Sequence, residues 1–406
     1  MNITIAILGL AVLVLVHEAG HFFVARAVGM NPRRFYLGFP PALVKVRRKG
    51  IEYGIGAIPL GGYVKIPGMH RPAASDLDVQ FGPAIQEQPS IFPKAARVKR
   101  ALEEQDFRGA RDALPALEAE VDAAQLTPAA ERAGQRGLNE LRDALSDDAY
   151  WRQQTWRRIA VIFAGPGVNI VLALILSALA YGIGTKTATP VVRSVDLMRP
   201  AAIAGLHEGD RIVAVNDKPT PDFESVSRAI RTSKGRMLTL RVIREGESRT
   251  LEPVKPVRDG DHYILGFRPK LTTEKLSFAG SVEQSVDDNW SATKLTVTFL
   301  PRLFTGSGRK DVSSTVGIVD YSSQAVGIDF SFFLQILGLI SLSLALLNLL
   351  PLLPLDGGHI LFSIIEGIRG RAVGREVYER VSAIGIALFI VLMFIGLSND
   401  IGRLTG

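Results

Sequence analysis

The sequence predicts a polytopic α-helical membrane protein with four transmembrane helices, a cytoplasmic-side β-hairpin and an exterior α+β domain. Three observations support this fold class. Apolar runs with almost no charge alternate with stretches rich in Arg, Lys, Asp and Glu, so a single soluble core cannot use the whole chain. Arginines cluster at the ends of the apolar runs. Two of the intervening stretches are rich in β-branched residues and turn signals.

The composition also excludes several classes of protein. The 406 residues include no cysteine, which excludes a disulfide framework, a thiolate metal site and a cysteine nucleophile. The net charge is +7, but the 47 basic residues are mixed with 40 acidic ones instead of forming a patch. We therefore expect no nucleic acid among the partners.

Four apolar segments predict the membrane spans. A span needs about 20 apolar residues, and we expect the four helices within residues 1–30, 157–184, 330–358 and 380–398. An alternative for residues 3–16 is a cleaved signal peptide. That stretch lacks a basic n-region, and no small-x-small cleavage site follows it, so a retained span is favoured.

Three arginine clusters predict the orientation of the spans, because positive charge near span ends marks the cytoplasmic side. The clusters follow the first span and precede the second and the fourth. Together they place both termini and residues 185–329 outside. Their members are Arg26, Arg33 and Arg34; Arg152, Arg157 and Arg158; and Arg369, Arg371, Arg375 and Arg380.

Residues 31–71 are predicted to form a membrane-associated β-hairpin on the cytoplasmic side. Residues 42–49 and 51–66 are rich in β-branched and aromatic residues, and a turn is expected at 48–50. The hairpin is followed by the Gly- and Pro-containing stretch Pro-Leu-Gly-Gly-Tyr at residues 59–63.

Residues 72–150 are predicted to be a charged helical insertion. In residues 95–113 and 128–145, apolar residues recur at helical spacing with charges between them, which suggests a small cytoplasmic helical hairpin. The alternative is a solvated and partly disordered insertion.

The exterior part is predicted to contain a compact α+β module. Residues 187–270 alternate short β-rich runs with turns and contain one expected helix at 223–232. Residues 271–329 are expected to link this module to the third span.

Chemically reactive residues lie inside the first apolar run. His17, Glu18 and His21 form an HExxH pattern. On a helix, the two histidines lie one turn apart on one face and can direct their imidazoles at one Zn²⁺, while Glu18 can reach an activated water as general base. The alternative is a histidine pair that is hydrogen-bonded across helices, with Glu18 as an interfacial anchor.

A two-histidine zinc site needs a third protein ligand. At the end of the third apolar run, residues 348–359 read Asn-Leu-Leu-Pro-Leu-Leu-Pro-Leu-Asp-Gly-Gly-His. Asp356 is the one acid in that stretch, and the flanking prolines and glycines predict irregular backbone of the kind that lines a cavity. Asp356 is therefore the best candidate, with His359 as a poorer one. A plain Asp-Gly turn that ends a helix is the structural alternative.

Taken together, these motifs resemble those of the site-2 protease family of intramembrane zinc metalloproteases, in its bacterial branch with one PDZ domain. The paired HExxH and N-x-x-P-x-x-P-L-D-G-G motifs carry most of the resemblance. Further matches are Pro-Leu-Gly-Gly-Tyr-Val at 59–64, Phe-Ala-Gly-Pro-Gly-Val-Asn at 163–169, and a PDZ-like Gly205 to Asp210 stretch. Residues 72–149 have no counterpart in the resemblance.

The resemblance implies roles for individual residues. His17, His21 and Asp356 would be zinc ligands and Glu18 the catalytic base. Substrate-binding roles would fall to Asn348 near the active site and to the β-element with Gly61, Gly62 and Tyr63, whose exposed edge can pair with an extended peptide. For the two glycines, an ordinary turn is the alternative.

The resemblance also implies substrates and location. These are single-span membrane proteins cleaved in or near the span, such as an anti-sigma factor or a remnant signal peptide, in a bacterial inner membrane. The PDZ-like module would bind extended peptide ends and gate access. A different class of function also fits the module: a membrane scaffold or chaperone with a non-catalytic metal site. Glu18 beside the ligands argues for catalysis, because a structural zinc site would fill all four positions with protein ligands.

Overall fold

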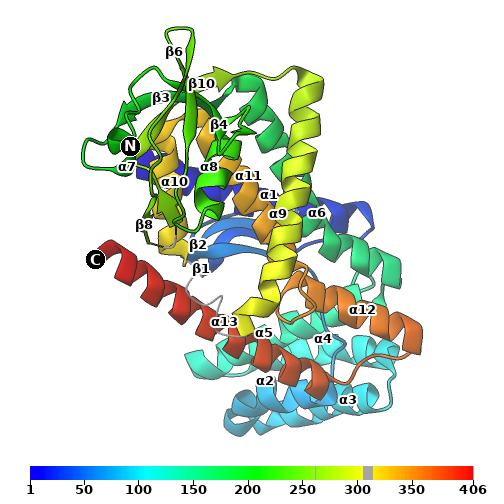
Figure 1. The fold of residues 1–406 in the computed structure, drawn as a ribbon. Helices are drawn as coiled ribbons and strands as arrows, with labels where there is room; N and C mark the ends of the chain where they lie inside the picture. The colour runs from blue at the N-terminus through cyan, green and yellow to red at the C-terminus, as the bar shows by residue number, and fades with distance from the viewer. Residues whose placement is uncertain (261, 305–313, 406) are drawn as a thin grey trace. The chain divides into compact units, whose positions relative to one another are not determined.

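The computed structural model describes residues 1–260, 262–304 and 314–405 (Figure 1). The chain divides into two compact units. The first comprises Met1–Ser177 together with Ser285–Gly406, and the second comprises Ala178–Gln284. The candidate chemistry of the sequence lies in the first unit.

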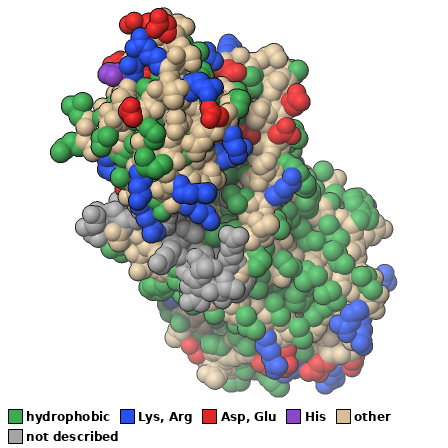
Figure 2. All heavy atoms as spheres, in the orientation of Figure 1, with side chains coloured by type: hydrophobic (Ala, Val, Ile, Leu, Met, Phe, Trp, Pro, Cys, Tyr) green, Lys and Arg blue, Asp and Glu red, His purple; other side chains and the backbone are tan. Residues whose placement is uncertain are grey.

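Four helices of the described chain are long and apolar enough to cross a membrane: α1 (Asn2–Ala27), α6 (Thr155–Ile183), α11 (Phe330–Asn348) and the central part of α13 (Arg375–Thr405). Their surfaces remain apolar where no other element covers them, as at Phe389 and Phe394. Figure 2 shows hydrophobic side chains over the α12 and α13 region, with charged side chains at the edge formed by the α2 and α3 helices. These helices, together with the β-sheets described in the following paragraphs, confirm the prediction of a helical membrane protein that also has a β-rich part.

Small side chains let the apolar helices approach closely. A Cβ atom on Gly338 of α11 would lie 2.9 Å from Ser177 Oγ of α6. Nearby, the Ser341 hydroxyl donates a hydrogen bond to the Asn169 carbonyl oxygen at 2.9 Å. Close packing of this kind, rather than a hydrophobic driving force, associates helices in lipid. It joins α6 to α11.

Strands β1 (Arg34–Arg48) and β2 (Ile51–Lys65) form the predicted β-element, but β1 begins well before residue 42. Each strand contributes two segments to one sheet. Residues 34–37 have partners in both 52–55 and 62–65, while residues 42–48 pair with 56–51. Residues 34–37 therefore lie inside the sheet, and residues 62–65 form one of its edges.

The insertion holds four helices, α2 (Ala74–Glu87), α3 (Phe92–Glu103), α4 (Phe107–Ala123) and α5 (Pro128–Leu145), where a helical hairpin was expected. The expected first helix is interrupted because Gln105 has a positive φ and the Asp106 side chain caps a new helix by accepting from the Gly109 N–H. Phe81, Leu117 and Leu138 belong to a shared buried core, around which the four helices pack.

Ion pairs tie this helical insertion to the sheet. Arg33 contacts Asp143 at 2.9 Å and Asp148 at 3.1 Å, and the Lys65 ammonium lies 2.6 Å from Asp143. Arg33 directly precedes β1 and Lys65 ends β2, so Asp143 holds both ends of the two-stranded sheet, and Asp148 adds a second contact to Arg33.

The second unit is a small α+β structure. Its strand order is β10-β3-β4-β6-β7, with β5 beside β4, and β8 and β9 form a separate hairpin. The strands are β3 (Thr185–Val195), β4 (Arg211–Val215), β5 (Lys218–Pro219), β6 (Leu240–Arg244), β7 (Glu247–Thr250), β8 (Val257–Asp259), β9 (His262–Ile264) and β10 (Phe267–Glu274). Helices α7 (Pro200–Ile203) and α8 (Phe223–Thr232) complete it, and Ile212, Val226 and Leu240 belong to its core.

A buried ion pair in this unit leads to a stability prediction. Asp210 is fully buried, and Arg244 donates hydrogen bonds to its carboxylate at 2.7 and 2.8 Å. Burial alone would raise the pKa of Asp210, but the bonds from Arg244 and from the His207 backbone lower it below its usual value. The stabilisation is therefore fully present above about pH 4, and it is lost as the pH falls through the folded-state pKa.

We expect Arg244→Ala to destabilise the second unit by about 3 kcal/mol at pH 7, because an uncompensated buried carboxylate remains. Hydrogen-exchange protection of the β4 and β6 amides in the full-length protein would measure the loss. Adding Asp210→Asn to Arg244→Ala should recover part of it. Equal protection in wild type and Arg244→Ala at neutral pH would contradict this prediction.

Within residues 271–329, expected to be an exterior linker, the described part holds the end of β10 and two helices. These are α9 (Phe278–Phe304) and α10 (Thr315–Ile328). From Ser285 onward the segment belongs to the first unit. Ala325 of α10 packs in one buried cluster with Leu13 of α1 and Phe333 of α11. Apolar residues of α10 thus pack against α1 and α11. The segment is short, and its sequence did not predict this packing.

Candidate metal centre

Helix α1 brings His17 and His21 together, as the four-residue spacing predicts. Both side chains are buried, and their Nε2 atoms lie 3.3 Å apart. The rings meet edge to face, with an interplanar angle of 83°. Two imidazole nitrogens therefore face the same point inside an apolar helix.

Asp356 comes to this point from the far end of the chain. Helix α11 ends at Asn348, and α12 (Asp356–Arg369) begins with Asp356 after a short irregular segment. Gly357 and Gly358 permit the tight packing there: Cβ atoms would lie 2.2 Å from the Leu349 carbonyl oxygen and 2.6 Å from the Leu353 nitrogen. As a result, Asp356 Oδ2 lies 3.3 Å from His17 Nε2 and 3.4 Å from His21 Nε2.

These three atoms fit a zinc ion. Ligand atoms of a tetrahedral site with bonds of 2.0–2.1 Å are about 3.3–3.4 Å apart, which matches all three distances between these atoms. Asp356 Oδ2 is also buried without a hydrogen-bond partner within the described residues. A buried carboxylate oxygen without a partner is costly, and a cation would satisfy it. Three protein ligands leave a fourth position open, which is typical of catalytic rather than structural zinc.

The orientation of His21 depends on helix α6. His21 Nδ1 donates to the Val161 carbonyl oxygen at 2.8 Å, which directs the lone pair of Nε2 toward the other two ligands. Gly165 lies opposite: its Cβ would be 2.3 Å from His21 Nε2 and 2.9 Å from His17 Cε1. A Cβ on Gly20 would likewise lie 2.6 Å from the Ala164 carbonyl oxygen. Gly165 belongs to the Phe-Ala-Gly-Pro-Gly-Val-Asn motif at 163–169, but the motif by itself predicts no role for it, because its contacts are with a distant helix.

We expect Gly165→Ala to weaken zinc binding by roughly 10- to 100-fold, the usual effect of disturbing the residues that orient metal ligands. The new methyl group would occupy space now held by the two imidazoles. Gly167→Ala is the matched control, because the atoms nearest to its Cβ would belong to the Phe163 ring, at 3.1 Å, and not to a histidine. Metal analysis of both purified variants would test this, and equal zinc contents would contradict it.

Glu18 lies beside the edge of the sheet. A Cβ on Gly62 would fall 2.2 Å from Glu18 Cγ and 3.0 Å from its Oε1, so only glycine allows this backbone to approach. The Glu18 carboxylate also interacts with the backbone N–H of Val64. The edge formed by residues 62–65 thus passes directly over the HExxH helix.

The remaining candidate residues occupy different positions. Gly61, next to Gly62, has φ of +110°, which a residue with a side chain rarely adopts, and Tyr63 packs near the Phe39 ring. Asn348 is half-buried at the end of α11. His359, the poorer candidate ligand, has its Nδ1 hydrogen-bonded to the Tyr378 hydroxyl and is not one of the three clustered ligands.

The comparisons with known proteins agree with this geometry. The model of peptidase family M50 matches residues 5–392. A relative from Agrobacterium fabrum, whose name contains the words zinc metalloprotease, is 30% identical over 98% of this chain and 95% of its own length. The regulator of sigma-E protease RseP of Escherichia coli is 29% identical over 98% of both chains, and that of Salmonella typhimurium 28% over 99% of both.

These matches confirm the family resemblance that the motifs indicate, and with it the membrane and protease character of the protein. The family match extends from α1 into α13, so it covers both the HExxH helix and Asp356. The scaffold alternative is not favoured. The chain belongs to peptidase family M50, the site-2 protease family, and is an intramembrane zinc metalloprotease.

Proposed function

We propose that His17, His21 and Asp356 hold the catalytic zinc and that Glu18 is the general base for hydrolysis of a peptide bond in or near a transmembrane segment. The observation that carries the proposal is the triangle of 3.3–3.4 Å between the three ligand atoms, set beside Glu18 inside an apolar helix. Ionisable side chains in such a helix are costly and therefore point to function.

Each group at the site has its own chemical role. A bound zinc ion supplies Lewis-acid polarisation of the scissile carbonyl and activates water for attack. Glu18 accepts the proton of the attacking water and passes it to the leaving amine nitrogen. The apolar side chains around His17 and His21 exclude other water, which strengthens these electrostatic interactions.

The sheet edge is the proposed substrate platform. A peptide bond inside a helix has its carbonyl engaged in the helical hydrogen-bond ladder, so the substrate must unwind before attack. Residues 62–65 pair with residues 34–37 on one side, and we propose that an unwound substrate adds to the other side. Gly61, Gly62 and Tyr63 would line this edge, and Asn348 would contact the substrate near the metal.

The second unit and the membrane orientation complete the proposal. We place both termini and the second unit outside, in a bacterial inner membrane, on the strength of the arginine clusters. The unit would act as a PDZ-like module that binds extended peptide ends and admits substrates already shortened outside. Suitable substrates are single-span proteins such as an anti-sigma factor or a remnant signal peptide, in keeping with the sigma-E protease names of two relatives.

Cleavage in a reconstituted bilayer tests this function. A single-span substrate with two Gly substitutions in its span should be cut at least tenfold faster than the same substrate with Leu at those positions, because glycine lowers the cost of unwinding. Mass spectrometry would locate the cut bond. A cut confined to the soluble part of the substrate, or equal rates for the two substrates, would contradict the proposal.

A further inference from the structure

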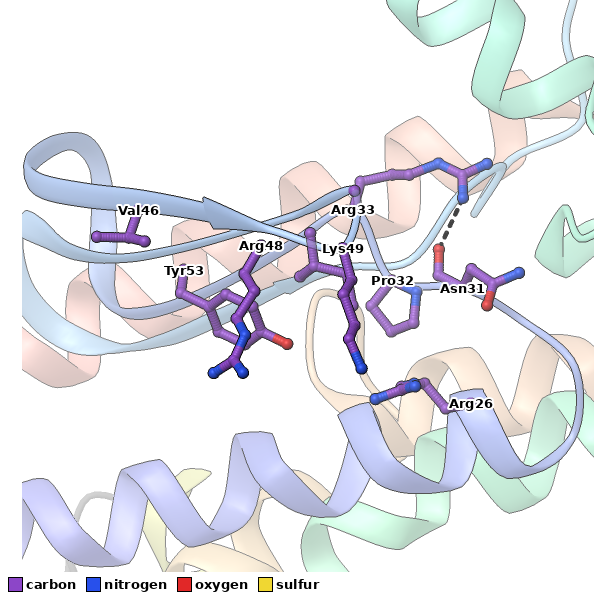
Figure 3. A pocket seen from close by; sticks show the side chains of 10 residues that line it. Arg26, Asn31, Pro32, Arg33, Val46, Arg48, Lys49 and Tyr53 are labelled. Carbon is purple, nitrogen blue, oxygen red and sulfur yellow. Dashed lines mark hydrogen bonds between the residues drawn. The ribbon is translucent and has the colours of Figure 1, made fainter.

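A cavity of about 660 Å³ lies between the sheet and the end of α1. Its lining includes Arg26 from the last turn of α1, Arg48 and Lys49 from the hairpin turn, and Tyr53 and Val46 from the strands. Figure 3 shows the side chains of Arg26, Arg48 and Lys49 extending into the space between the sheet and the helix, with Lys49 directed toward Arg26.

These three cations have no acidic partner among the described residues. Arg26 lies over the Phe22 ring, 5.8 Å from its centroid, and no carboxylate is among the residues that line the cavity. Nearby acids are engaged elsewhere: Asp143 and Asp148 bind Arg33, whose guanidinium points away from the three cations in Figure 3. Glu52 lies on the other face of the sheet with Arg34 and Lys45.

In a neighbouring cavity, acidic side chains balance the charge of the basic ones. It measures about 290 Å³ and is also lined by basic residues, but Glu52 and Asp143 contribute to its wall. Converging like charges repel each other at short range. The larger cavity therefore has an unmatched positive potential that an anion would neutralise, whereas the smaller one supplies its own anions.

The position of the cavity indicates where that anion comes from. Arg26 ends a helix long enough to span a membrane, so the cavity lies at the membrane boundary. The strands beside it expose Leu43, Val44 and Val46, each more than 60% exposed, and Val46 lines the cavity itself. Cations next to an exposed apolar surface fit the two parts of a phospholipid. The phosphate would lie at the cations and the acyl chains along the valines.

We propose that Arg26, Arg48 and Lys49 bind the phosphate of an anionic phospholipid, and that the lipid joins the hairpin turn of the sheet to the end of α1. Tyr53 adds a hydroxyl at the same wall. Free phosphate shares the headgroup chemistry, but it cannot use the apolar surface of Val46.

Lipid retention by the full-length protein tests the site. Native mass spectrometry would count phosphatidylglycerol molecules retained by protein taken from bilayers that mix it with phosphatidylcholine. We expect Arg26→Gln/Arg48→Gln/Lys49→Gln to bind the anionic lipid on the order of 100-fold more weakly, because each cation near an anionic surface contributes about fivefold. The control Lys94→Gln/Arg97→Gln/Arg100→Gln removes the same charge from exposed positions on α3 and should bind like wild type.

Two single variants test whether the effect is specific to this cavity. The single variant Arg48→Gln should lose about fivefold, whereas Arg47→Gln, whose side chain lines the smaller cavity, should not. Zinc content would establish that each variant is folded. Equal lipid retention by the triple variant and its control would overturn the proposal, as would displacement of the lipid by millimolar inorganic phosphate.

Discussion

Glu18→Gln protein should bind zinc and substrate but cleave nothing that the wild type cleaves. The substitution keeps the shape and hydrogen-bonding capacity of the side chain and leaves the ligand triangle of His17, His21 and Asp356 untouched. It removes the carboxylate that we propose as the acceptor of the water proton, an effect typically worth 10²- to 10⁴-fold. Cleavage of a single-span protein by purified enzyme, with no other protease present, measures the loss.

The control for this experiment is Glu376→Gln, the same change at an exposed position in the first turn of α13. It should cleave at the wild-type rate. Uncut substrate should accumulate in complex with the Glu18→Gln protein, because the sheet edge does not need the base in order to bind. Normal turnover by Glu18→Gln would remove Glu18 from the mechanism.

Asp356→Ala should lose bound zinc and, with it, all activity. Asp356 Oδ2 is the third corner of the ligand triangle, and two histidines alone make a poor zinc site. Disturbing residues that merely orient ligands costs roughly 10- to 100-fold in affinity, so loss of a ligand itself should exceed that. Metal analysis after purification, with circular dichroism to check folding, measures the effect.

His359→Ala is the matched control, because His359 lies in the same helix and pairs with Tyr378 instead of the triangle. It should retain zinc. The reverse result, with stoichiometric zinc in Asp356→Ala and depletion in His359→Ala, would assign the third ligand position to His359.

Local spacing in the sequence was enough to predict several features. The apolar runs predict the four long helices, because a membrane span is defined by the length and composition of one continuous segment. The spacing of His17 and His21 predicts their common face, because residues four apart on a helix lie one above the other. Helix α8 of the second unit has the bounds expected from the sequence, residues 223–232.

Other features depend on contacts between distant segments. The insertion holds four helices around a core because α2 and α5, far apart in the chain, bury Phe81 and Leu138 together. The second pairing of residues 34–37 places Gly62 against Glu18, and no spacing within either strand specifies it. The role of Gly165 follows only from the crossing of α6 over α1.

The third candidate ligand separates most clearly what the sequence predicts from what the packed structure decides. The sequence left two candidates, Asp356 and His359, within one short motif, and both residue types bind zinc. Residues three apart on a helix lie on much the same face, so spacing does not choose between the two, and the packing of the segment before α12 sets which side chain meets the histidines. Helical periodicity is a property of a single segment and can be read from the chain, whereas a ligand triangle that joins residues 17 and 356 exists only after the helices pack.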